Sequence, residues 1–309
     1  MRNKKKLTAY SVTQCALYKC KSKKRLAKLL FMSLNDLNSL IYDIDNCYYY
    51  FTMNKDGSNE KRGITAPKEK LKKIQKRILY LLQRIEKPEW VISSSFGKSY
   101  ITNAQYHLNS KFICKTDIKQ FYDNCTRDRV YRFFKDKLLT SSDVAKIITD
   151  LTTRDNIPTG SPSSQLIAYF AYEEMFKGIN TIAKNYGCSM TMYVDDLVFS
   201  NESDFKHQTL SRDVDIEVRK YKHKLKTKKT RYYSTKNGAP VTGVIVKRYK
   251  LHIPNSARKD VINGFSKIKK YQDVSEKELA SMTGKVNATR LIEKDHFNGI
   301  KSYLKTAYN

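Results

Sequence analysis

The sequence predicts an α+β fold in which helices alternate with short antiparallel strands. Apolar residues recur at helical spacing in several segments, most clearly between Leu71 and Ile85. Short runs of β-branched and aromatic residues bounded by turn residues predict strands, as at residues 48–64 and 190–200. From Ser256 onward the pattern is helical throughout. The chain is therefore expected to begin with helices and a hairpin, to continue with mixed helices and strands, and to end in a basic helical tail.

Individual elements follow from the same periodicities and from their end signals, among them Ser33 as a helix N-cap, Pro67 in a first helical turn and Gly187 as a helix stop. The expected helices cover residues 26–31, 33–44, 67–87, 127–138, 143–151, 163–186, 205–223 and 257–270, and a further one is opened by a capping box at 275–278. The expected strands cover residues 48–53, 61–64, 111–117, the two segments that flank Asp195 and Asp196, and 241–246, with turns at 55–58, 158–162 and 236–238. Residues 96–107 mix small polar residues with isolated aromatics and are expected to form a structured loop.

The charge balance predicts a polyanionic partner. Lysine and arginine number 59 against 30 aspartates and glutamates, which gives a formal charge of +29. Self-repulsion of this size destabilises a compact chain unless nucleic acid or an anionic membrane covers it. No run of about 18 apolar residues occurs, and residues 1–6 lack the apolar segment of a signal peptide, so no membrane association is expected. Nucleic acid is the remaining partner.

The N-terminal arm, residues 1–45, is basic and partly helical. Ten lysines and arginines lie between Arg2 and Lys28, and no acidic residue precedes Asp36. The arm either clamps a phosphate backbone or is a solvated terminus.

The cysteines indicate the redox setting. All six are scattered without a CxxC pair, and the five histidines do not cluster with them. Neither a zinc site nor a disulfide framework is expected from these spacings, and a reducing cytoplasm is the natural location.

Three aspartates form the candidate chemical site. Asp195 and Asp196 are adjacent at the predicted tip of a hairpin, where like charges raise one another's pKa unless a cation such as Mg²⁺ neutralises them. Taken alone, such a pair also fits an ordinary acidic turn. Asp117 ends the predicted strand 111–117 and supplies a third carboxylate. Two metal ions held roughly 3.5–4 Å apart by shared carboxylates suit nucleotidyl transfer.

The sequences around these aspartates resemble the catalytic motifs of reverse transcriptases. Tyr193-Val194-Asp195-Asp196 is similar to the family's hairpin motif, and the segment from Asp117 to Tyr122 is similar to its first catalytic motif. The resemblance implies that Tyr122 blocks a ribose 2′-hydroxyl and so selects deoxynucleotides. A core tyrosine that follows a strand is the alternative interpretation.

Further segments resemble the nucleotide-binding parts of the family. Lys61 and Arg62 are similar to the basic residues that grip the incoming triphosphate. Thr159 and Gly160 lie in a segment similar to the loop that packs on the nascent base pair. Many relatives have glutamine where Thr159 stands, so the contact is expected from Gly160 and the local backbone. Lys229 is similar to the lysine that approaches the triphosphate, where it serves either as a general acid with a lowered pKa or as a backbone-binding cation.

Two signatures narrow the family to bacterial retron reverse transcriptases. Asn103-Ala104-Gln105-Tyr106-His107 matches the Asn-Ala-x-x-His signature, and Val241-Thr242-Gly243 matches the Val-Thr-Gly signature. The resemblance as a whole extends from about residue 61 to residue 246. His107 also fits a structural, hydrogen-bonded residue.

This resemblance implies a right-hand polymerase. Fingers and palm would occupy residues 1–246, with the palm an antiparallel sheet backed by helices, and a basic helical thumb would occupy residues 247–309. The implied reaction adds dNTPs to a DNA 3′ end on an RNA template with two Mg²⁺ ions at Asp117, Asp195 and Asp196. The implied partners are a cognate structured noncoding RNA, its branched RNA–DNA product (multicopy single-stranded DNA) and an accessory effector protein in anti-phage defence.

Two alternatives remain at the level of sequence. One is another bacterial reverse transcriptase, of group II intron or abortive-infection type, although the chain lacks a maturase-like extension. The other is a catalytically idle RNA-binding scaffold, which would have no need for three carboxylates in a basic protein.

Overall fold

The computed structural model describes residues 8–54, 61–270 and 274–307, and the turn predicted at 55–58 lies outside them. Its α-helices are α1 (Lys23–Leu29), α2 (Leu34–Tyr42), α3 (Glu69–Leu82), α4 (Tyr100–Tyr106), α5 (Arg127–Arg132), α6 (Ser142–Thr152), α7 (Ser164–Ala171), α8 (Glu173–Asn185), α9 (His207–Arg219), α10 (Asn255–Lys270), α11 (Glu276–Ile292) and α12 (Asn298–Ala307). Its strands are β1 (Tyr48–Asn54), β2 (Lys61–Pro67), β3 (Phe112–Asp117), β4 (Ser189–Tyr193), β5 (Asp196–Asn201), β6 (Arg231–Ser234), β7 (Ala239–Val241), β8 (Val244–Lys247) and β9 (Lys250–His252). This mixture of helices and antiparallel sheets confirms the predicted α+β class.

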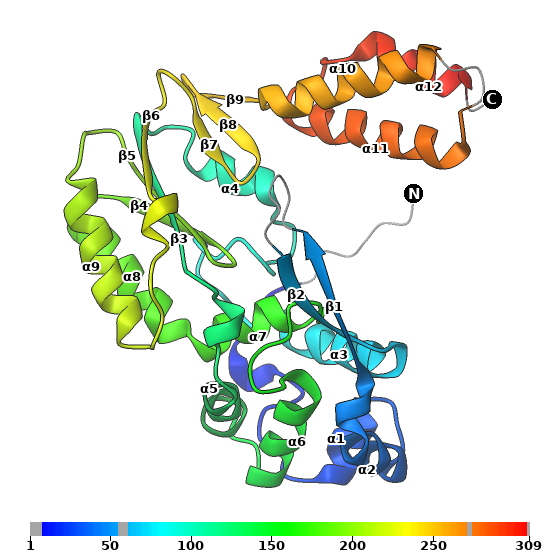
Figure 1. Cartoon of the computed structure of the whole chain (residues 1–309). Coiled ribbons are helices and arrows are strands. Elements are labelled where there is room, and N and C mark those ends of the chain that lie inside the picture. The colour runs from blue at the N-terminus through cyan, green and yellow to red at the C-terminus, as the bar shows by residue number, and fades with distance from the viewer. Residues whose placement is uncertain (1–7, 55–60, 271–273, 308–309) are drawn as a thin grey trace.

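A four-stranded antiparallel sheet lies at the centre of the fold, in the order β4-β5-β3-β6 (Figure 1). Successive side chains of a strand point to opposite faces. Leu197 and Phe199 of β5 belong to the large hydrophobic core that also contains the buried faces of α8 and α9. Val198 of β5 and Ile113 of β3 pack on the other face with Ala104 of α4 and with the small sheet β7-β8-β9. Both faces of the central sheet are therefore covered.

The N-terminal half surrounds α3. Figure 1 shows α1, α2, α3 and α6 at one end of the molecule, with the hairpin β1–β2 extending beyond α3. The helical spacing predicted from Leu71 onward is confirmed, but α3 ends at Leu82. The prediction that Pro67 opens the helix is wrong. Pro67 ends β2 opposite Tyr48, a position where a residue without an N–H is tolerated, and Lys68 is the helix N-cap.

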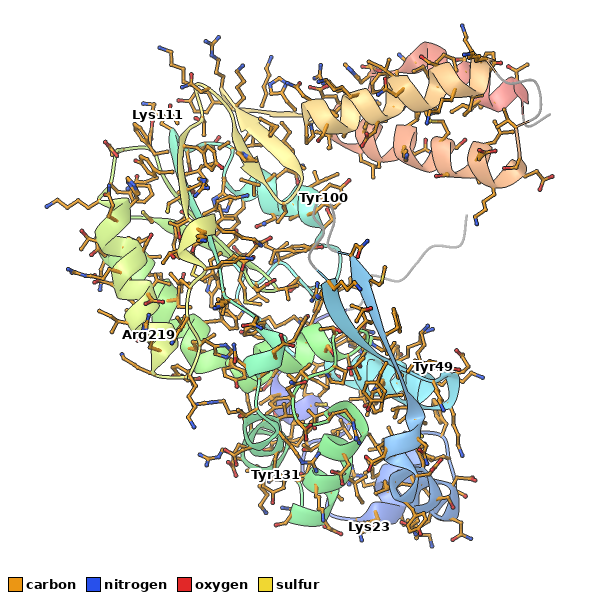
Figure 2. All side chains as sticks on the ribbon, viewed as in Figure 1. Lys23, Tyr49, Tyr100, Lys111, Tyr131 and Arg219 are labelled. Atoms are coloured by element: carbon orange, nitrogen blue, oxygen red, sulfur yellow. The ribbon has the colours of Figure 1, made fainter. Side chains whose placement is uncertain are left out.

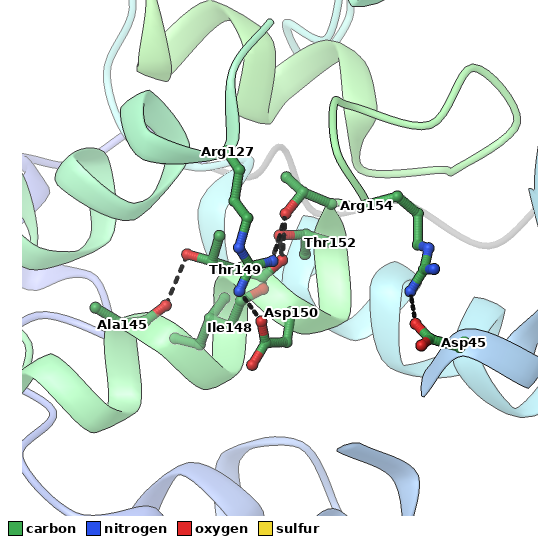
Figure 3. A network of polar contacts seen from close by, with 9 residues as sticks. Asp45, Arg127, Ala145, Ile148, Thr149, Asp150, Thr152 and Arg154 are labelled. Carbon is green, nitrogen blue, oxygen red and sulfur yellow. Dashed lines mark hydrogen bonds and ion pairs between the residues drawn. The ribbon is translucent and has the colours of Figure 1, made fainter. Parts of the chain in front are cut away.

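Polar contacts join α5, α6 and the segment before β1 (Figure 3). Arg127 of α5 forms an ion pair with Asp150 of α6, and Arg154 forms one with Asp45. The hydroxyl of Thr149 donates to the carbonyl of Ala145 within α6 at 2.7 Å. A π-helical turn, Phe133–Lys137, extends α5 and completes the helical segment predicted at 127–138.

The prediction of a loop at residues 96–107 is wrong, because this segment contains α4. The Ser99 hydroxyl accepts hydrogen bonds from the N–H groups of Ile101 and Thr102, at 3.2 and 3.4 Å. The Thr102 hydroxyl in turn accepts from the N–H of Ser99 at 3.2 Å. This is a capping box in which threonine takes the place of the usual glutamate or glutamine, so the sequence signal was weak.

The single long helix predicted at 163–186 is two helices, α7 and α8, which meet at Tyr172. The backbone of Tyr172 leaves the helical region, with φ −120° and ψ 20°. Its hydroxyl donates to the carbonyl of Asn124 at 3.1 Å and accepts from the N–H of Thr126 at 2.9 Å. These tertiary bonds override the local helical preference, and the stop predicted at Gly187 is found, with φ +67°.

The strand predicted at 241–246 is a hairpin of β7 and β8. Thr242 and Gly243 form its two-residue turn, with φ of +43° and +84°, as a type I′ turn requires. The predicted turn at 236–238 joins β6 of the central sheet to β7 of the small sheet.

The last three helices have their own core, made by Val261, Met282, Val286 and Leu304. In Figure 1 they stand apart from the central sheet, joined to it through β9. The helical pattern predicted from Ser256 onward is confirmed, because α10 starts at Asn255, and β9 pairs with β8 in the segment before it. The capping box at Ser275 and Glu278 is confirmed. No helix in the described ranges is long and apolar enough to cross a membrane.

Candidate active site

The hairpin β4–β5 carries the acidic pair as predicted. Tyr193 pairs with Asp196, so Val194 and Asp195 form a two-residue turn. Val194 has φ +63°, a left-handed conformation that a β-branched residue adopts only under constraint. The hairpin tip is therefore a strained turn that fixes the direction in which Asp195 leaves the sheet.

The register of the central sheet brings Asp117 to the same place. Asp117, the last residue of β3, lies directly opposite Asp196, the first residue of β5. The N–H of Ile118 donates to the carbonyl oxygen of Asp195 at 3.0 Å. This bond holds the two chain segments together beyond the last paired residues of β3 and β5. Three carboxylates from segments far apart in the sequence thus meet at one end of the sheet.

Their electrostatics show mutual repulsion. Burial, together with the charges of Asp117 and Asp196, raises the pKa of Asp195 to about 6. Burial and the charge of Asp117 likewise raise the pKa of Asp196. Carboxylates whose charge is this unfavourable favour a cation beside them.

Lys229 supplies a cation at this site. Its Nζ donates to Oδ2 of Asp117 at 2.5 Å, and its side chain is half exposed. Burial opposes its charge, but the hydrogen bond to Asp117 and the attraction of Asp196 and Asp195 outweigh burial and raise the pKa of Lys229. The resemblance implied either a general acid with a lowered pKa or a backbone-binding cation, and the contact with Asp117 shifts the pKa in the direction opposite to the first.

The three aspartates have the donor chemistry of a metal site. In the described part of the chain, no three histidine, cysteine, aspartate or glutamate side chains converge closely enough to hold a metal ion. Asp117 instead directs a carboxylate oxygen to Lys229. Hard oxygen donors, and a pKa of Asp195 that burial and the neighbouring carboxylates raise, nevertheless fit a divalent cation.

Tyr122 lies beside this cluster. Burial raises its pKa, with the charge of Asp195 adding to the effect and the charge of Arg62 opposing it. Tyr122 is thus within electrostatic reach of both residues, while its ring packs against Phe121 at 5.7 Å between centroids. Lys61 and Arg62 are exposed at the start of β2. The structure therefore places the predicted gate, Tyr122, within electrostatic reach of Asp195 and of Arg62.

The loop at Thr159 and Gly160 is bound to β2. The N–H of Gly160 donates to the carbonyl of Thr65 at 3.0 Å, and the Thr159 hydroxyl accepts from the N–H of Thr65 at 3.4 Å. A Cβ on Gly160 would lie 2.9 Å from Cα and Cβ of Ala66 and from the Thr65 oxygen. Glycine is required here because the two backbones touch.

The two signature segments lie away from the aspartates, where they pack against each other. Nδ2 of Asn103 on α4 donates to the Thr242 hydroxyl at 3.3 Å, and that hydroxyl donates to the carbonyl of Tyr100 at 2.9 Å. Asn103 and Val241 are fully buried, while Gly243 with Thr242 makes the hairpin turn. These segments fasten α4 to the small sheet.

His107 is a buried link between α4 and the central sheet. Its Nδ1 and Nε2 each lie 2.7 Å from a hydroxyl, that of Ser200 on β5 and that of Thr191 on β4. Burial lowers the pKa of His107 to about 3, so its ring is neutral.

Acid should destabilise the fold through His107. Because its folded pKa is below the ordinary value, its contribution is complete above about pH 6.5 and is lost as the pH falls toward 3. We expect roughly 2 kcal/mol of the unfolding free energy to disappear between about pH 7.5 and about pH 5 on this account. Urea unfolding of His107→Asn, with His207→Asn as control, measures this, and an equally steep pH dependence in His107→Asn would contradict it.

Ser93 is a supporting residue that the sequence did not reveal. Its hydroxyl accepts the N–H of Val194 at 2.9 Å, and its side chain is buried. The preceding residues lie along β4, where the N–H of Ile92 donates to the carbonyl of Met192 at 3.0 Å and the N–H of Met192 donates to that of Trp90 at 2.9 Å. Nothing in a run of three serines distinguishes Ser93 from its neighbours.

Comparison with known proteins defines the class. The family model described as "Reverse transcriptase (RNA-dependent DNA polymerase)" matches residues 53–246, more than half of the 309 residues. The chain therefore belongs to the reverse transcriptase family.

The curated relatives are retron enzymes, which confirms the resemblance found in the sequence. The Retron Se72 reverse transcriptase of Salmonella heidelberg (strain 579083-10) is 26% identical over 230 residues, which cover 72% of this chain and 61% of that protein. The Retron Ec86 reverse transcriptase of Escherichia coli is 26% identical over 240 residues, 76% of this chain and 74% of that protein. The Retron Ec48 reverse transcriptase of Escherichia coli is 22% identical over 304 residues, 91% of this chain and 74% of that protein. The chain thus aligns with about three fifths of the first of these relatives.

Removal of the Ser93 hydroxyl should slow catalysis through Val194. We expect Ser93→Ala to lower the rate of nucleotide addition about tenfold, because an unsupported left-handed valine costs on the order of 1–3 kcal/mol. Glycine adopts this conformation freely, so the same change in a Val194→Gly background should cost less than about threefold. Single-turnover primer extension, normalised to active-site concentration, measures both, with Ser95→Ala as control. If Ser93→Ala lowers the rate equally in the wild-type and the Val194→Gly backgrounds, Ser93 does not act through Val194.

Proposed function

We propose that this chain is the RNA-directed DNA polymerase of a retron, adding deoxynucleotides to a DNA 3′ end on an RNA template. The observation that carries the proposal is the register that sets Asp117 opposite Asp196, with Asp195 in the adjoining turn. In a chain of charge +29, three partly neutralised carboxylates suit a reaction on phosphates. Membership of the reverse transcriptase family supports the same reaction.

The aspartates would hold divalent cations, which we propose to be two Mg²⁺ ions. When bound, these ions supply charge neutralisation and lower the pKa of the attacking 3′-hydroxyl. Asp195, with its pKa raised to about 6, gains most from a neighbouring cation. Lys229 contributes a positive charge beside Asp117 and, being half exposed, can turn toward a triphosphate.

Selection of the nucleotide is assigned to Tyr122 and the hairpin β1–β2. Tyr122 is partly buried with its ring packed against Phe121, and it serves as the steric gate against a 2′-hydroxyl. Arg62, with Lys61 beside it, binds the triphosphate. The N–H of Gly160 is already bonded to Thr65, so the role proposed for this loop is to support β2.

The polymerase parts follow from the described elements. Fingers and palm are proposed up to residue 246, with the sheet β4-β5-β3-β6 as the palm. The small sheet continues through β9, so the thumb is proposed to consist of α10–α12 from Asn255.

The biological role extends the proposal. By analogy with the retron relatives, the substrate is a cognate structured noncoding RNA, and the product is a small DNA joined to that RNA through a 2′-hydroxyl. Asn103, His107 and Val241 are buried and Thr242 bonds to α4, so we assign the two signatures to holding the fold that binds this RNA. An accessory effector, anti-phage defence and a cytoplasmic location complete the proposed role.

Two assays test this function. Purified protein should extend a DNA primer on an RNA template with Mg²⁺ and dNTPs, and Tyr122→Ala should admit ribonucleotides that the wild type rejects. Nucleic acid that copurifies from cells should contain a small DNA joined to a structured RNA. Failure to extend any primer would indicate an RNA-binding scaffold. Extension without the joined product would indicate another kind of bacterial reverse transcriptase.

A further inference from the structure

A stripe of cationic and aromatic side chains runs along the solvent side of α3. Lys73, Arg77, Tyr80 and Arg84 follow one another at spacings of four, three and four residues, which places them on one face of the helix and its C-terminal extension. The opposite face carries the buried residues of α3. We call these four residues, with Phe31 and Tyr10, the basic–aromatic ridge.

The ridge is ordered by stacking between segments. The Arg77 guanidinium lies 4.0 Å from the ring centroid of Phe31 and 5.2 Å from that of Tyr80, and its Nε donates to the carbonyl of Leu29 at 2.8 Å. Arg84 lies 4.7 Å from the ring of Tyr10. Its Nε donates to the carbonyl of Thr8 at 3.0 Å. Both guanidinium groups are therefore fixed with donors to spare.

The exposure of these rings is unusual for apolar groups. Phe31 is 78% exposed and has φ +58°, and Tyr80 is 50% exposed. Burial in the core, the ordinary role of large aromatics, does not account for them. They flank Arg77 on either side and leave flat faces open to solvent.

The charge along the ridge is mostly positive, and Glu69, one turn before Lys73 on α3, is an exposed acidic residue on the same face. Within the described residues, no carboxylate forms an ion pair with Lys73, Arg77 or Arg84. The adjoining α1 carries further exposed lysines and no acid, and Lys23 marks this end of the molecule in Figure 2. A merely solvated cationic face would need neither the stacked arginines nor the exposed rings.

We propose that the basic–aromatic ridge is a second RNA-binding surface, separate from the site of the three aspartates. Lysine and arginine side chains bind successive phosphates, and Phe31 and Tyr80 stack on unpaired bases. The inference rests on the proposed function, because the RNA that it binds is the enzyme's own template RNA. It assigns the ridge to a single-stranded part of that RNA, since stacking on a protein ring needs a base free of its helix.

Binding of a labelled RNA stem-loop with a single-stranded tail tests the ridge, using the full chain. We expect Tyr80→Ala and Phe31→Ala each to weaken binding roughly tenfold. Lys73→Gln combined with Arg77→Gln should reduce the slope of log affinity against log salt by about 1.4, which is about 0.7 for each lost phosphate contact. Tyr42→Ala is the matched control, because Tyr42 is 95% exposed but lies next to Asp43.

The outcomes separate this inference from the proposed function. If the ridge variants bind the RNA with wild-type affinity and with a wild-type salt slope, the proposed role of the ridge in RNA binding is overturned. This holds even if the wild type extends a short RNA-templated primer. A wild type that neither extends the primer nor binds the RNA would overturn the proposed function first. Lys73→Gln alone changes only an exposed side chain, so a weaker slope there supports the ridge if the double variant fails to fold. If the ridge variants no longer bind an acidic protein that the wild type binds, but still bind the RNA as the wild type does, the ridge is a protein interface and the proposal is overturned.

Discussion

Asp195→Asn should abolish DNA synthesis and, in the absence of divalent metal, should make the protein more stable. In the proposed function the charge of Asp195 holds a catalytic cation, so we expect nucleotide addition to fall at least about 10³-fold. The same charge is unfavourable in the folded chain, because the pKa of Asp195 rises from 3.8 to about 6. The ionised carboxylate therefore costs roughly 2–3 kcal/mol above about pH 6, and asparagine removes that cost.

Thermal unfolding in EDTA measures the stability, and primer extension on an RNA template measures the activity. Since the folded pKa is above that of the unfolded chain, the stabilisation by asparagine should be absent below about pH 4 and should grow until about pH 6. We expect a gain of a few degrees in Tm at neutral pH. Asp128→Asn, on the surface beside Arg132, is the matched control. An Asp195→Asn protein that is inactive because it unfolds at a lower temperature would contradict this account.

Gly160→Ala should disturb the hairpin β1–β2 more than its single added carbon suggests. The new Cβ would lie 2.9 Å from Ala66 Cα and from the Thr65 oxygen, and backbone atoms cannot rotate aside as a side chain does. The loop and β2 must therefore separate, which breaks the bond from Gly160 to Thr65 and costs about 1–3 kcal/mol. Because β2 carries Arg62, we expect the KM for dNTP to rise about tenfold.

Gly63→Ala is the control for this substitution. Gly63 lies on the same strand, and a Cβ there would meet no atom within 4 Å. Steady-state primer extension over a range of dNTP concentrations compares the two variants, and urea unfolding gives their stabilities. If both variants have wild-type KM for dNTP and wild-type stability, the close approach of the Gly160 loop to β2 contributes neither to nucleotide binding nor to stability.

The meeting of the three aspartates could be predicted from sequence because its signals are local. A buried strand ends at Asp117, and a β-prone run surrounds Asp195 and Asp196, so the pairing of two strands suffices to bring the three together. The same is true of α3 and of the capping box at Ser275, where one short pattern determines one element.

The features that escaped prediction depend on partners distant in the chain. Tyr172 interrupts a helix because its hydroxyl bonds to the segment at residues 124–126, and no local pattern encodes that bond. For His107 the sequence indicated a structural, hydrogen-bonded residue but not its partners, Thr191 and Ser200. Ser93 acquires its role only from the strained turn at Val194. In each case tertiary contacts outweigh local preference.

The long separation between the joined segments also affects how the protein folds. The bond from Lys229 to Asp117 closes a loop of 112 residues, and β3 has β6 and β5, both much later in the chain, as its two neighbours. Closing such loops lowers the conformational entropy of the chain before stabilising contacts have formed, so proteins rich in distant contacts fold slowly. During synthesis the carboxylates cannot meet their cationic partner until Lys229 has left the ribosome. The basic residues up to Lys28 are made long before Lys229, so they are exposed while the contact between Asp117 and Lys229 is still missing.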